Sequence, residues 1–347
     1  MKIRSRAPLR LGLAGGGTDL ESYSNVYGGA VLNATIKMYA YCTIEPTNNG
    51  RISIVAYDNN NSLDIESTPE IKIEGEELIL HKGVYNRIVK DFNGGKPLSF
   101  NMSTSNDAPV GSGLGTSSTM VVAILEAFNN WLKLGLSQYD MAMLAYSIER
   151  EDLLLKGGKQ DQFSAVYGGF NLMEFNKDGS TTIAPLNLDG FTLNELESSL
   201  ILFYNGRSRS SAKIISEQIS NAKQKKIKTI TAMHSLKKCA YKMKETLEKG
   251  KVSGFARILK QTWAEKKKTS SIISNNELEI IIKFAMANGA KGLKISGAGG
   301  GGFLMLYCNP HDRQRLTDAM KTLHGQIFPV YFSSKGVESW TVVENED

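Results

Sequence analysis

Residues 109–118 read PVGSGLGTSS and have the composition of a phosphate-binding loop. The run lies between a predicted strand over 98–104 and a predicted apolar helix over 118–135. Glycines let a backbone approach an anion closely, and a helix start presents unpaired N–H groups. Hydroxyls can bond phosphate oxygens or join a Mg²⁺ shell. We therefore expect a phosphate cradle, the alternative being a tight turn with hydroxyl caps. Its residues are Pro109, Gly111, Ser112, Gly113, Leu114, Gly115, Thr116, Ser117 and Ser118.

A second glycine-rich segment, residues 294–302, reads KISGAGGGG and precedes the apolar run FLMLY. Gly297 opens a formal G-x-G-x-x-G, but a dinucleotide-binding fingerprint leads into a helix, whereas FLMLY predicts a strand. The Walker A pattern G-x-x-x-x-G-K-[ST] is absent from the sequence. We expect a strand–loop–strand turn that either approaches something closely or acts as a flexible hinge.

A third cluster, Gly15-Gly16-Gly17-Thr18-Asp19, follows APLR near the N-terminus. Glycines directly before Thr18 and Asp19 would expose both polar side chains on a compact loop. Alternatively, Asp19 caps a following helix over ESYSNVY. The residues by themselves leave both interpretations open.

Two carboxylates complete the set of candidate residues. Glu149 lies near the end of a helix predicted over 138–155, which Ser137 and Asp140 open as a capping box. Asp161 follows a glycine pair on a predicted loop. One carboxylate beside a phosphate cradle can hold Mg²⁺, and a second can orient or deprotonate a hydroxyl acceptor. The alternative for residues 149–152 is an ordinary charged helix end.

The elements that must position these residues indicate an α+β fold. Apolar runs predict strands in IRSRAPLRLGLAGG, GGAVLNATI, MYAYCTIEP, ISIVAY, FSAVYGGFNLMEF, TTIAPL and SLILFYN, and long helices follow to about residue 268. The polar stretch 58–80 predicts a loop and an exposed hairpin. A regular βαβ alternation is missing, which favours α+β over α/β. An interruption at 190–198 predicts two domains, 1–195 and 196–347.

Composition excludes several classes of protein. The 347 residues suffice for two buried cores, and the three cysteines are too few and too widely spaced for a disulfide framework or a zinc site. No apolar run reaches the roughly 18 residues of a transmembrane helix. The arginine-rich N-terminus lacks the apolar stretch of a signal peptide. We expect a cytoplasmic protein without a membrane partner.

A basic block spans residues 207–268, with 18 basic and 4 acidic side chains. Such a block can bind nucleic acid. It contains no nucleic-acid motif and few interleaved aromatic residues, so we favour the solvated faces of lysine-rich helices and expect no nucleic-acid partner.

With these segments in hand, the sequence resembles the GHMP small-molecule kinases, the family of galactokinase, homoserine kinase and mevalonate kinase. APLR…GGGTD, PVGSGLGTSS and KISGAGGGG stand in the family's order along essentially the whole chain. The resemblance implies an N-terminal domain related to ribosomal protein S5 domain 2 and a ferredoxin-like C-terminal domain. It also implies that ATP and Mg²⁺ bind at the central loop and that the acceptor lies between the domains.

The resemblance also implies roles for individual residues. Ser117 and Glu149 would share Mg²⁺, Asp161 would face the acceptor hydroxyl, and Arg10 would pair with Asp161. The implied acceptor-binding residues are Gly16, Gly17, Thr18, Asp19, Gly158, Lys159, Arg209 and Gly297. Galactokinases carry Glu-His where this chain has Gly16-Gly17, which argues against galactose.

Within the family, GGGTDL, GGKQDQF and YNGRSRSSA most resemble kinases that phosphorylate the anomeric O1 of a heptose 7-phosphate. That resemblance implies a sugar phosphate substrate, with Lys159, Arg207, Arg209 and Lys213 as candidates for holding its phosphate. The alternatives are a kinase for an unphosphorylated sugar, such as fucose or another hexose, and a non-catalytic sugar sensor. The oligomeric state is expected to be monomer or homodimer.

Overall fold

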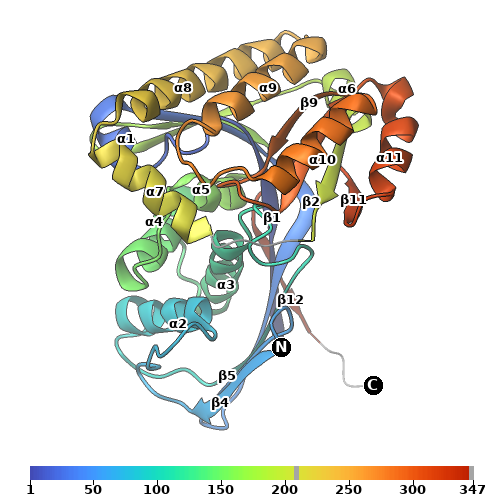
Figure 1. The fold of residues 1–347 in the computed structure, drawn as a ribbon. Helices are drawn as coiled ribbons and strands as arrows, with labels where there is room; N and C mark the ends of the chain where they lie inside the picture. Colours follow the sequence, from blue (N-terminus) through green and yellow to red (C-terminus); the bar gives the residue numbers. More distant parts are fainter. Residues whose placement is uncertain (207–210, 344–347) are drawn as a thin grey trace.

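The computed structural model describes residues 1–206 and 211–343, and a long, mostly antiparallel sheet runs through its centre (Figure 1). Within these residues the sheet has eight strands in the order β12-β1-β2-β5-β3-β4, with β6 and β7 joined to β2. Only β3 and β5 pair in parallel. The strands are β1 (Lys2–Ala14), β2 (Gly29–Pro46), β3 (Arg51–Ala56), β4 (Asn61–Glu66), β5 (Phe100–Asn106), β6 (Phe170–Phe175), β7 (Thr181–Leu186) and β12 (Glu338–Val342).

β2 is one strand of 18 residues, where the sequence predicted two. Its first part pairs with β6 and its last part with β5, while β1 follows it on the other side. The register with β1 shifts between Pro8 and Arg10, opposite the polar segment around Lys37. Between these pairs β1 advances from Pro8 to Arg10 while β2 advances from Tyr39 to Thr35, so the extra residues of this irregularity lie on β2.

Helices from the first half of the chain cover one face of this sheet. α3 (Thr116–Leu132) packs on β1 and β2 and buries most of its side chains, as its apolar sequence predicted. Phe100 and Phe128 anchor this core. Around α3 lie α2 (Ile79–Phe92), α4 (Gln138–Ser147), the π-helical turn η1 (Ile148–Asp152) and α5 (Gln160–Tyr167). The short helix α1 (Glu21–Tyr27) instead contacts α7 (Ser211–Lys223).

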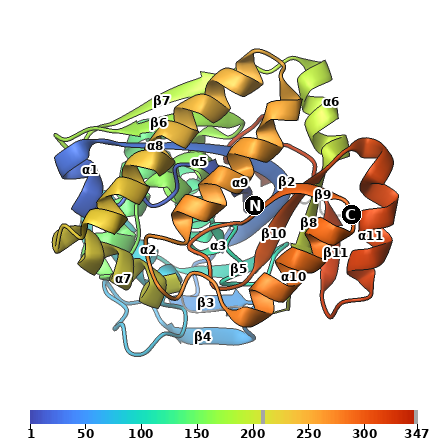
Figure 2. The ribbon, with the colours of Figure 1, turned by 45° about the horizontal axis from the view of Figure 1, so that its top comes forward.

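A second sheet, in the order β11-β8-β10-β9, has helices on both faces (Figure 2). Leu200 and Leu202 of β8 face a core shared with β1, α8 and α9, whereas Ile201 and Phe203 face α10 and α11. This period of two is that of a strand buried on both faces. The elements are α6 (Gly190–Ser199), β8 (Leu200–Tyr204), α8 (Ile227–Glu248), η2 (Val252–Gly254), α9 (Phe255–Lys266), α10 (Asn276–Ala287), β9 (Ala290–Ile295), β10 (Phe303–Cys308), η3 (Pro310–Asp312), α11 (Arg313–Lys321) and β11 (Gln326–Pro329).

Two local predictions were wrong. Residues 160–167 form α5 rather than the loop and strand that were expected, so Asp161 lies in the first turn of a helix. The stretch 58–80, predicted as a loop and an exposed hairpin, contributes a single strand, β4, which forms a hairpin with the preceding β3, and no strand follows over 67–78. The α+β class itself is confirmed. The capping box is confirmed as well, since the Ser137 hydroxyl accepts from the N–H of Asp140.

The domain division at 195/196 stays a prediction. The boundary lies within α6, directly before the second sheet begins at Leu200. The chain later returns to the first sheet, where β12 pairs with β1 and Glu338 binds Arg6.

The basic block forms α7, α8 and α9. Several of its lysines pair with glutamates one turn away on the helix surface, as Lys244 does with Glu248 and Lys249 with Glu245. Lys237 and Lys266 instead reach inward to backbone carbonyls. In the part of the chain that the structure describes, no helix combines the length and the apolar character needed to cross a membrane.

Candidate active site

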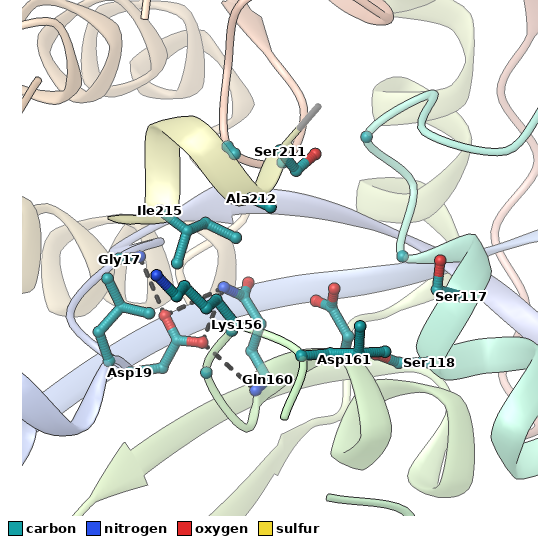
Figure 3. Close-up of a pocket in the computed structure, with 18 of the residues that line it drawn as sticks. Gly17, Asp19, Ser117, Ser118, Lys156, Gln160, Asp161, Ser211, Ala212 and Ile215 are labelled. Carbon is teal, nitrogen blue, oxygen red and sulfur yellow. Dashed lines mark hydrogen bonds between the residues drawn. The ribbon is translucent and has the colours of Figure 1, made fainter. Parts of the chain in front are cut away.

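A pocket of about 260 Å³ lies where the central glycine loop, the N-terminal glycine cluster, η1, α5, α7 and α9 meet (Figure 3). Segments that are far apart in the sequence therefore share one cavity. The predicted residues that line it are Arg10, Gly17, Asp19, Gly111, Gly113, Gly115, Thr116, Ser117, Ser118, Glu149, Gly158, Asp161 and Gly297.

The central loop connects β5 to α3 and packs against the C-terminal glycine segment, backbone on backbone. The N–H of Phe303 donates to the carbonyl of Ser112 at 3.0 Å. A Cβ on Gly113 would lie 2.5 Å from the Ser296 carbonyl oxygen, and one on Gly297 would lie 2.8 Å from Gly113. Both glycines have positive φ, so larger residues are excluded for two reasons. Of the two predictions for residues 294–302, close approach is the one that this packing supports.

The start of α3 opens toward the pocket. Gly115 precedes the helix with φ of 80° and provides no side-chain cap. The first N–H groups of a helix lack intrahelical partners, and they carry the positive end of the helix dipole. Thr116, Ser117 and Ser118 line the cavity at this point. The arrangement is suited to binding an anion.

Glu149 is enclosed beside this helix start, with an exposed fraction of 2%. One carboxylate oxygen accepts from the Ser118 hydroxyl at 3.0 Å, and the other accepts from the Gln162 amide. Burial raises the pKa of Glu149, while Arg150 and these two hydrogen bonds oppose the rise. The direct hydroxyl neighbour of Glu149 is thus Ser118, whereas Ser117 is exposed at the pocket.

Arg10 joins Asp161 to the central loop. Its Nε and Nη2 lie 2.8 and 2.7 Å from Asp161 Oδ1, and its Nη1 donates to the Gly113 carbonyl at 2.6 Å. The Arg10 side chain is buried, whereas Asp161 remains 24% exposed. Among the described residues, Oδ2 of Asp161 has no hydrogen-bond donor. Figure 3 shows this carboxylate pointing into the cavity between Gln160 and Ser117.

Asp19 lies on the other side of the pocket. Its Oδ1 accepts from the N–H of Gly17 at 3.0 Å, and the Gln160 amide lies 3.1 and 3.0 Å from its two oxygens (Figure 3). A Cβ on Gly158 would lie 1.9 Å from Oδ2, so that position requires glycine. α1 begins after Leu20 and has no side-chain cap. Asp19 is therefore not its cap but a carboxylate at the cavity wall.

Several predicted residues are not brought to the cavity wall. The Lys159 ammonium donates to the Gly179 carbonyl at 2.7 Å and lies over the Tyr146 ring, away from the pocket. The Thr18 hydroxyl is buried against the carbonyls of Gly15 and Ala30. The remaining members of this group are Gly16, Pro109, Ser112, Leu114 and Lys213, none of which lines the cavity. Arg207 and Arg209 lie outside the described residues.

Sequence reasoning missed residues that the fold adds to the pocket. Gln160, Arg150, Lys156, Gln218 and Lys266 all line it. Gln160 precedes Asp161 in the sequence. Had a helix been predicted to start at this point, Gln160 would have been recognised as a candidate pocket residue. Lys266 carried no such signal, because it is one of many lysines in the basic block.

Both halves of the chain resemble known proteins. The model of the GHMP kinases N terminal domain matches residues 79–169, and that of the GHMP kinases C terminal region matches residues 243–325. The D-glycero-alpha-D-manno-heptose 7-phosphate kinase of Campylobacter jejuni is 44% identical over 98% of this chain and 99% of its own.

Two solved structures extend the comparison. A D-glycero-D-manno-heptose 1-phosphate kinase from Bacteroides thetaiotaomicron matches with a TM-score of 0.85 and 44% identity, covering 99% of this chain and all of its own. The galactokinase of Lactococcus lactis, in complex with galactose, shares the fold with a TM-score of 0.77 at 14% identity, over 97% of this chain and 95% of its own. The chain therefore belongs to the GHMP kinases, enzymes that use ATP to phosphorylate a hydroxyl group.

Proposed function

We propose that this kinase transfers the γ-phosphoryl group of ATP to the anomeric O1 of D-glycero-D-manno-heptose 7-phosphate. The product, a 1,7-bisphosphate, would feed the synthesis of nucleotide-activated heptose for surface polysaccharide. Support for the acceptor comes from the 44% identity, over nearly both full chains, to the Campylobacter jejuni enzyme of that name. The observation that carries the chemistry is the Arg10–Asp161 pair, which opens into the pocket beside the anion-binding loop.

Asp161 would orient the O1 hydroxyl and accept its proton as the phosphoryl group transfers. Arg10 occupies Oδ1, which leaves Oδ2 for the acceptor. An anomeric hydroxyl is more acidic than an ordinary alcohol, so a paired carboxylate is a sufficient base. A loose transition state leaves positioning and electrostatics as the main contributions of the protein.

Arg10 would also stabilise the transferring phosphoryl group. Its guanidinium bonds the Gly113 carbonyl at the floor of the anion-binding loop. A cation in this place lies between the acceptor carboxylate and the site proposed for the phosphates. Charge developing on the equatorial oxygens would be neutralised without reorganisation of the site.

Glu149 and Ser117 would hold Mg²⁺, with Ser118 positioning the carboxylate. A carboxylate and hydroxyls at one end of the pocket are the oxygen ligands that this ion prefers. When bound, Mg²⁺ neutralises charge on the β- and γ-phosphate oxygens.

Of the four cations that the sequence indicated for the acceptor phosphate, Arg207 and Arg209 lie outside the described residues and stay candidates. Lys159 is turned away, and Lys213 does not line the pocket. Lys156 is exposed at the cavity wall near the start of α7, and we propose it as the residue that holds the 7-phosphate.

The cytoplasm, where ATP and sugar phosphates are available, is the compartment that we propose. Monomer or homodimer, without nucleic acid, remains the proposed assembly.

A coupled ADP-release assay with MgATP tests this function directly. The acceptor panel contains heptose 7-phosphate, heptose 1-phosphate, mannose, fucose, galactose and mevalonate. The two heptose kinases in the comparison differ in the phosphate position of their names, so the product is mapped by phosphorus–carbon coupling in NMR. We expect turnover of heptose 7-phosphate with the new phosphate on C1. Turnover of only a free sugar would reassign the acceptor, and turnover of only heptose 1-phosphate would reverse the regiochemistry.

A further inference from the structure

Lys266 is a buried cation that faces the pocket from the C-terminal half of the chain. It is the last residue of α9, and 4% of its surface is exposed. Its ammonium donates to the carbonyl of Gly16 at 2.9 Å, and the structure gives it no other partner among the described residues. An ammonium has three donors, and a buried donor without an acceptor is costly. Two of the three N–H donors of Lys266 are therefore available to a ligand.

The surroundings of Lys266 indicate the chemistry of that ligand. The ammonium nitrogen lies 3.0 Å from the position that a Cβ on Gly17 would occupy. The N–H of Gly17 in turn donates a hydrogen bond to Asp19. The negative charge of Asp19 acts on Lys266 and offsets part of the effect of its burial. A carboxylate acceptor and an ammonium donor thus stand together at one wall of the cavity. A phosphate would be repelled by Asp19, whereas a neutral hydroxyl can donate to one group and accept from the other.

We propose that Lys266 is an acceptor-binding residue, which donates to ring hydroxyls of the sugar while Asp19 accepts from them. This assignment rests on the proposed function, in that it takes the acceptor to be a polyhydroxylated sugar. It places a residue of α9 opposite the N-terminal glycine cluster, so that the acceptor is held by both halves of the chain.

Lys294 shows that the position at the pocket, and not burial alone, distinguishes Lys266. It too is a buried lysine, 3% exposed, and its ammonium donates to the Gly12 carbonyl at 2.5 Å. It does not line the cavity. The two lysines form the same kind of contact with the same segment of β1 and the loop after it, so Lys294 provides the matched control.

The test compares Lys266→Met with Lys294→Met in steady-state kinetics with heptose 7-phosphate. We expect Lys266→Met to raise the acceptor KM by roughly tenfold to a hundredfold, the effect of losing a hydrogen bond to a charged group. The KM for ATP should change less than twofold. Lys294→Met removes a charge that interacts with Lys266 and Arg10 but no proposed contact with the acceptor, so it should raise the acceptor KM far less than Lys266→Met does. Equal effects of the two variants on the acceptor KM, or no effect of Lys266→Met, would overturn the proposal.

A second acceptor separates hydroxyl from phosphate recognition. Free heptose, used as an acceptor or as a competitive inhibitor, should suffer the same penalty from Lys266→Met as heptose 7-phosphate does. A penalty that disappears with the phosphate would show that Lys266 binds the phosphate, which contradicts the assignment.

Two further measurements separate the possible failures. If wild-type protein does not phosphorylate a heptose, the proposed function fails, and the two variants are compared on whichever acceptor it does phosphorylate. If Lys266→Met does not fold, judged by its thermal unfolding, Lys266→Gln replaces it, since the amide retains a donor and should give a smaller penalty. A Lys266→Gln variant that folds and binds acceptor like the wild type would overturn the proposal.

Discussion

Asp161 and Glu149, two carboxylates that line the pocket, have opposite surroundings. Asp161 is partly exposed and paired through one oxygen with Arg10. Glu149 is enclosed, and burial raises its pKa. The first environment leaves one carboxylate oxygen accessible to a hydroxyl, and the second favours a carboxylate whose negative charge is balanced by a bound cation. The difference lets two residues of one type serve different steps.

Asp161→Asn should lower kcat by roughly a hundredfold or more, because an amide can orient the hydroxyl but accepts its proton poorly. The KM for ATP should remain close to the wild-type value. Single-turnover kinetics with the mapped acceptor measure the chemical step. A near-wild-type rate would exclude Asp161 as the base.

Glu149→Gln should increase the Mg²⁺ concentration that gives half-maximal activity, since the neutral amide is a weaker ligand than a carboxylate. A Mg²⁺ titration at saturating ATP and acceptor measures this change. Asp152→Asn serves as the control, because that carboxylate pairs with Arg87 away from the cavity. Identical titration curves for Glu149→Gln and the wild type would remove Glu149 from the metal site.

Lys266 gives the acceptor KM a pH dependence. Burial and Arg10 lower the pKa of Lys266 to about 8, Asp19 opposes them, and the charge of Lys294 also interacts with it. As the pH rises from 7 to 9.5, the ammonium loses its proton and the acceptor KM should rise. The KM of Lys266→Met should stay flat across the same range. A parallel rise in both proteins would assign the effect to another group.

The free energy of unfolding of the ligand-free protein should depend on pH in the direction opposite to acceptor binding. The unfolded chain keeps the Lys266 proton up to its ordinary pKa of 10.5, whereas the folded protein releases it near 8. The unfolded state therefore binds more protons between these values, so this group makes the ligand-free protein more stable as the pH rises. Acceptor binding and stability thus respond to the same proton in opposite directions.

At the scale of elements, two glycine loops form one structure. The loop before α3 and the loop between β9 and β10 contact each other through Gly113 and Gly297, directly before the helix start that we propose as the phosphate site. The anion-binding geometry is therefore a property of the pair.

Gly297→Ala should lower the free energy of unfolding by more than the cost of its left-handed backbone conformation. It should also raise the KM for ATP. The new methyl group would meet the Gly113 backbone at 2.8 Å. Gly135→Ala is the control, because Gly135 has φ of 68° but no atom within 4 Å of its Cβ position. That variant should lose only the left-handed backbone cost, about 1 kcal/mol, with ATP binding intact. Equal losses in both variants, measured by denaturant unfolding and ATP titration, would exclude the loop contact.

At the scale of the whole molecule, one core joins both sheets. β1 contributes Leu9 and Leu11 to the same cluster as Leu202 of β8 and Phe255 of α9. The pocket lies at the edge of this shared core. Residues from both halves of the chain are held in place by it.

The three cysteines report on this core. Cys42, Cys239 and Cys308 are free and buried, and burial raises the pKa of Cys239 and Cys308. A thiol reagent should therefore react with no cysteine in the native protein and with all three after denaturation. The absorbance of the leaving group that the reagent releases gives the number of thiols that have reacted. Rapid reaction of one thiol before unfolding would show that its part of the core opens locally.

The sequence by itself determined the local features. It specified the capping box at Ser137, the apolar α3 and the three glycine segments, because capping, periodicity and tight turns depend on neighbouring residues. It also indicated Asp161, Arg10, Glu149 and Asp19, since their family motifs are contiguous. The three glycine motifs indicated the family, and the order of the predicted strands and helices indicated the α+β class.

Only the tertiary structure decided which groups meet. The reversed orientation of Lys159, the contact of Ser118 with Glu149 and the approach of Lys266 to Gly16 each depend on side-chain direction or on chain segments far apart in sequence. A lysine in a basic block has the same local pattern whether it faces water or a cavity. Long-range packing alone selects which one is buried, and that choice gives Lys266 its place at the pocket.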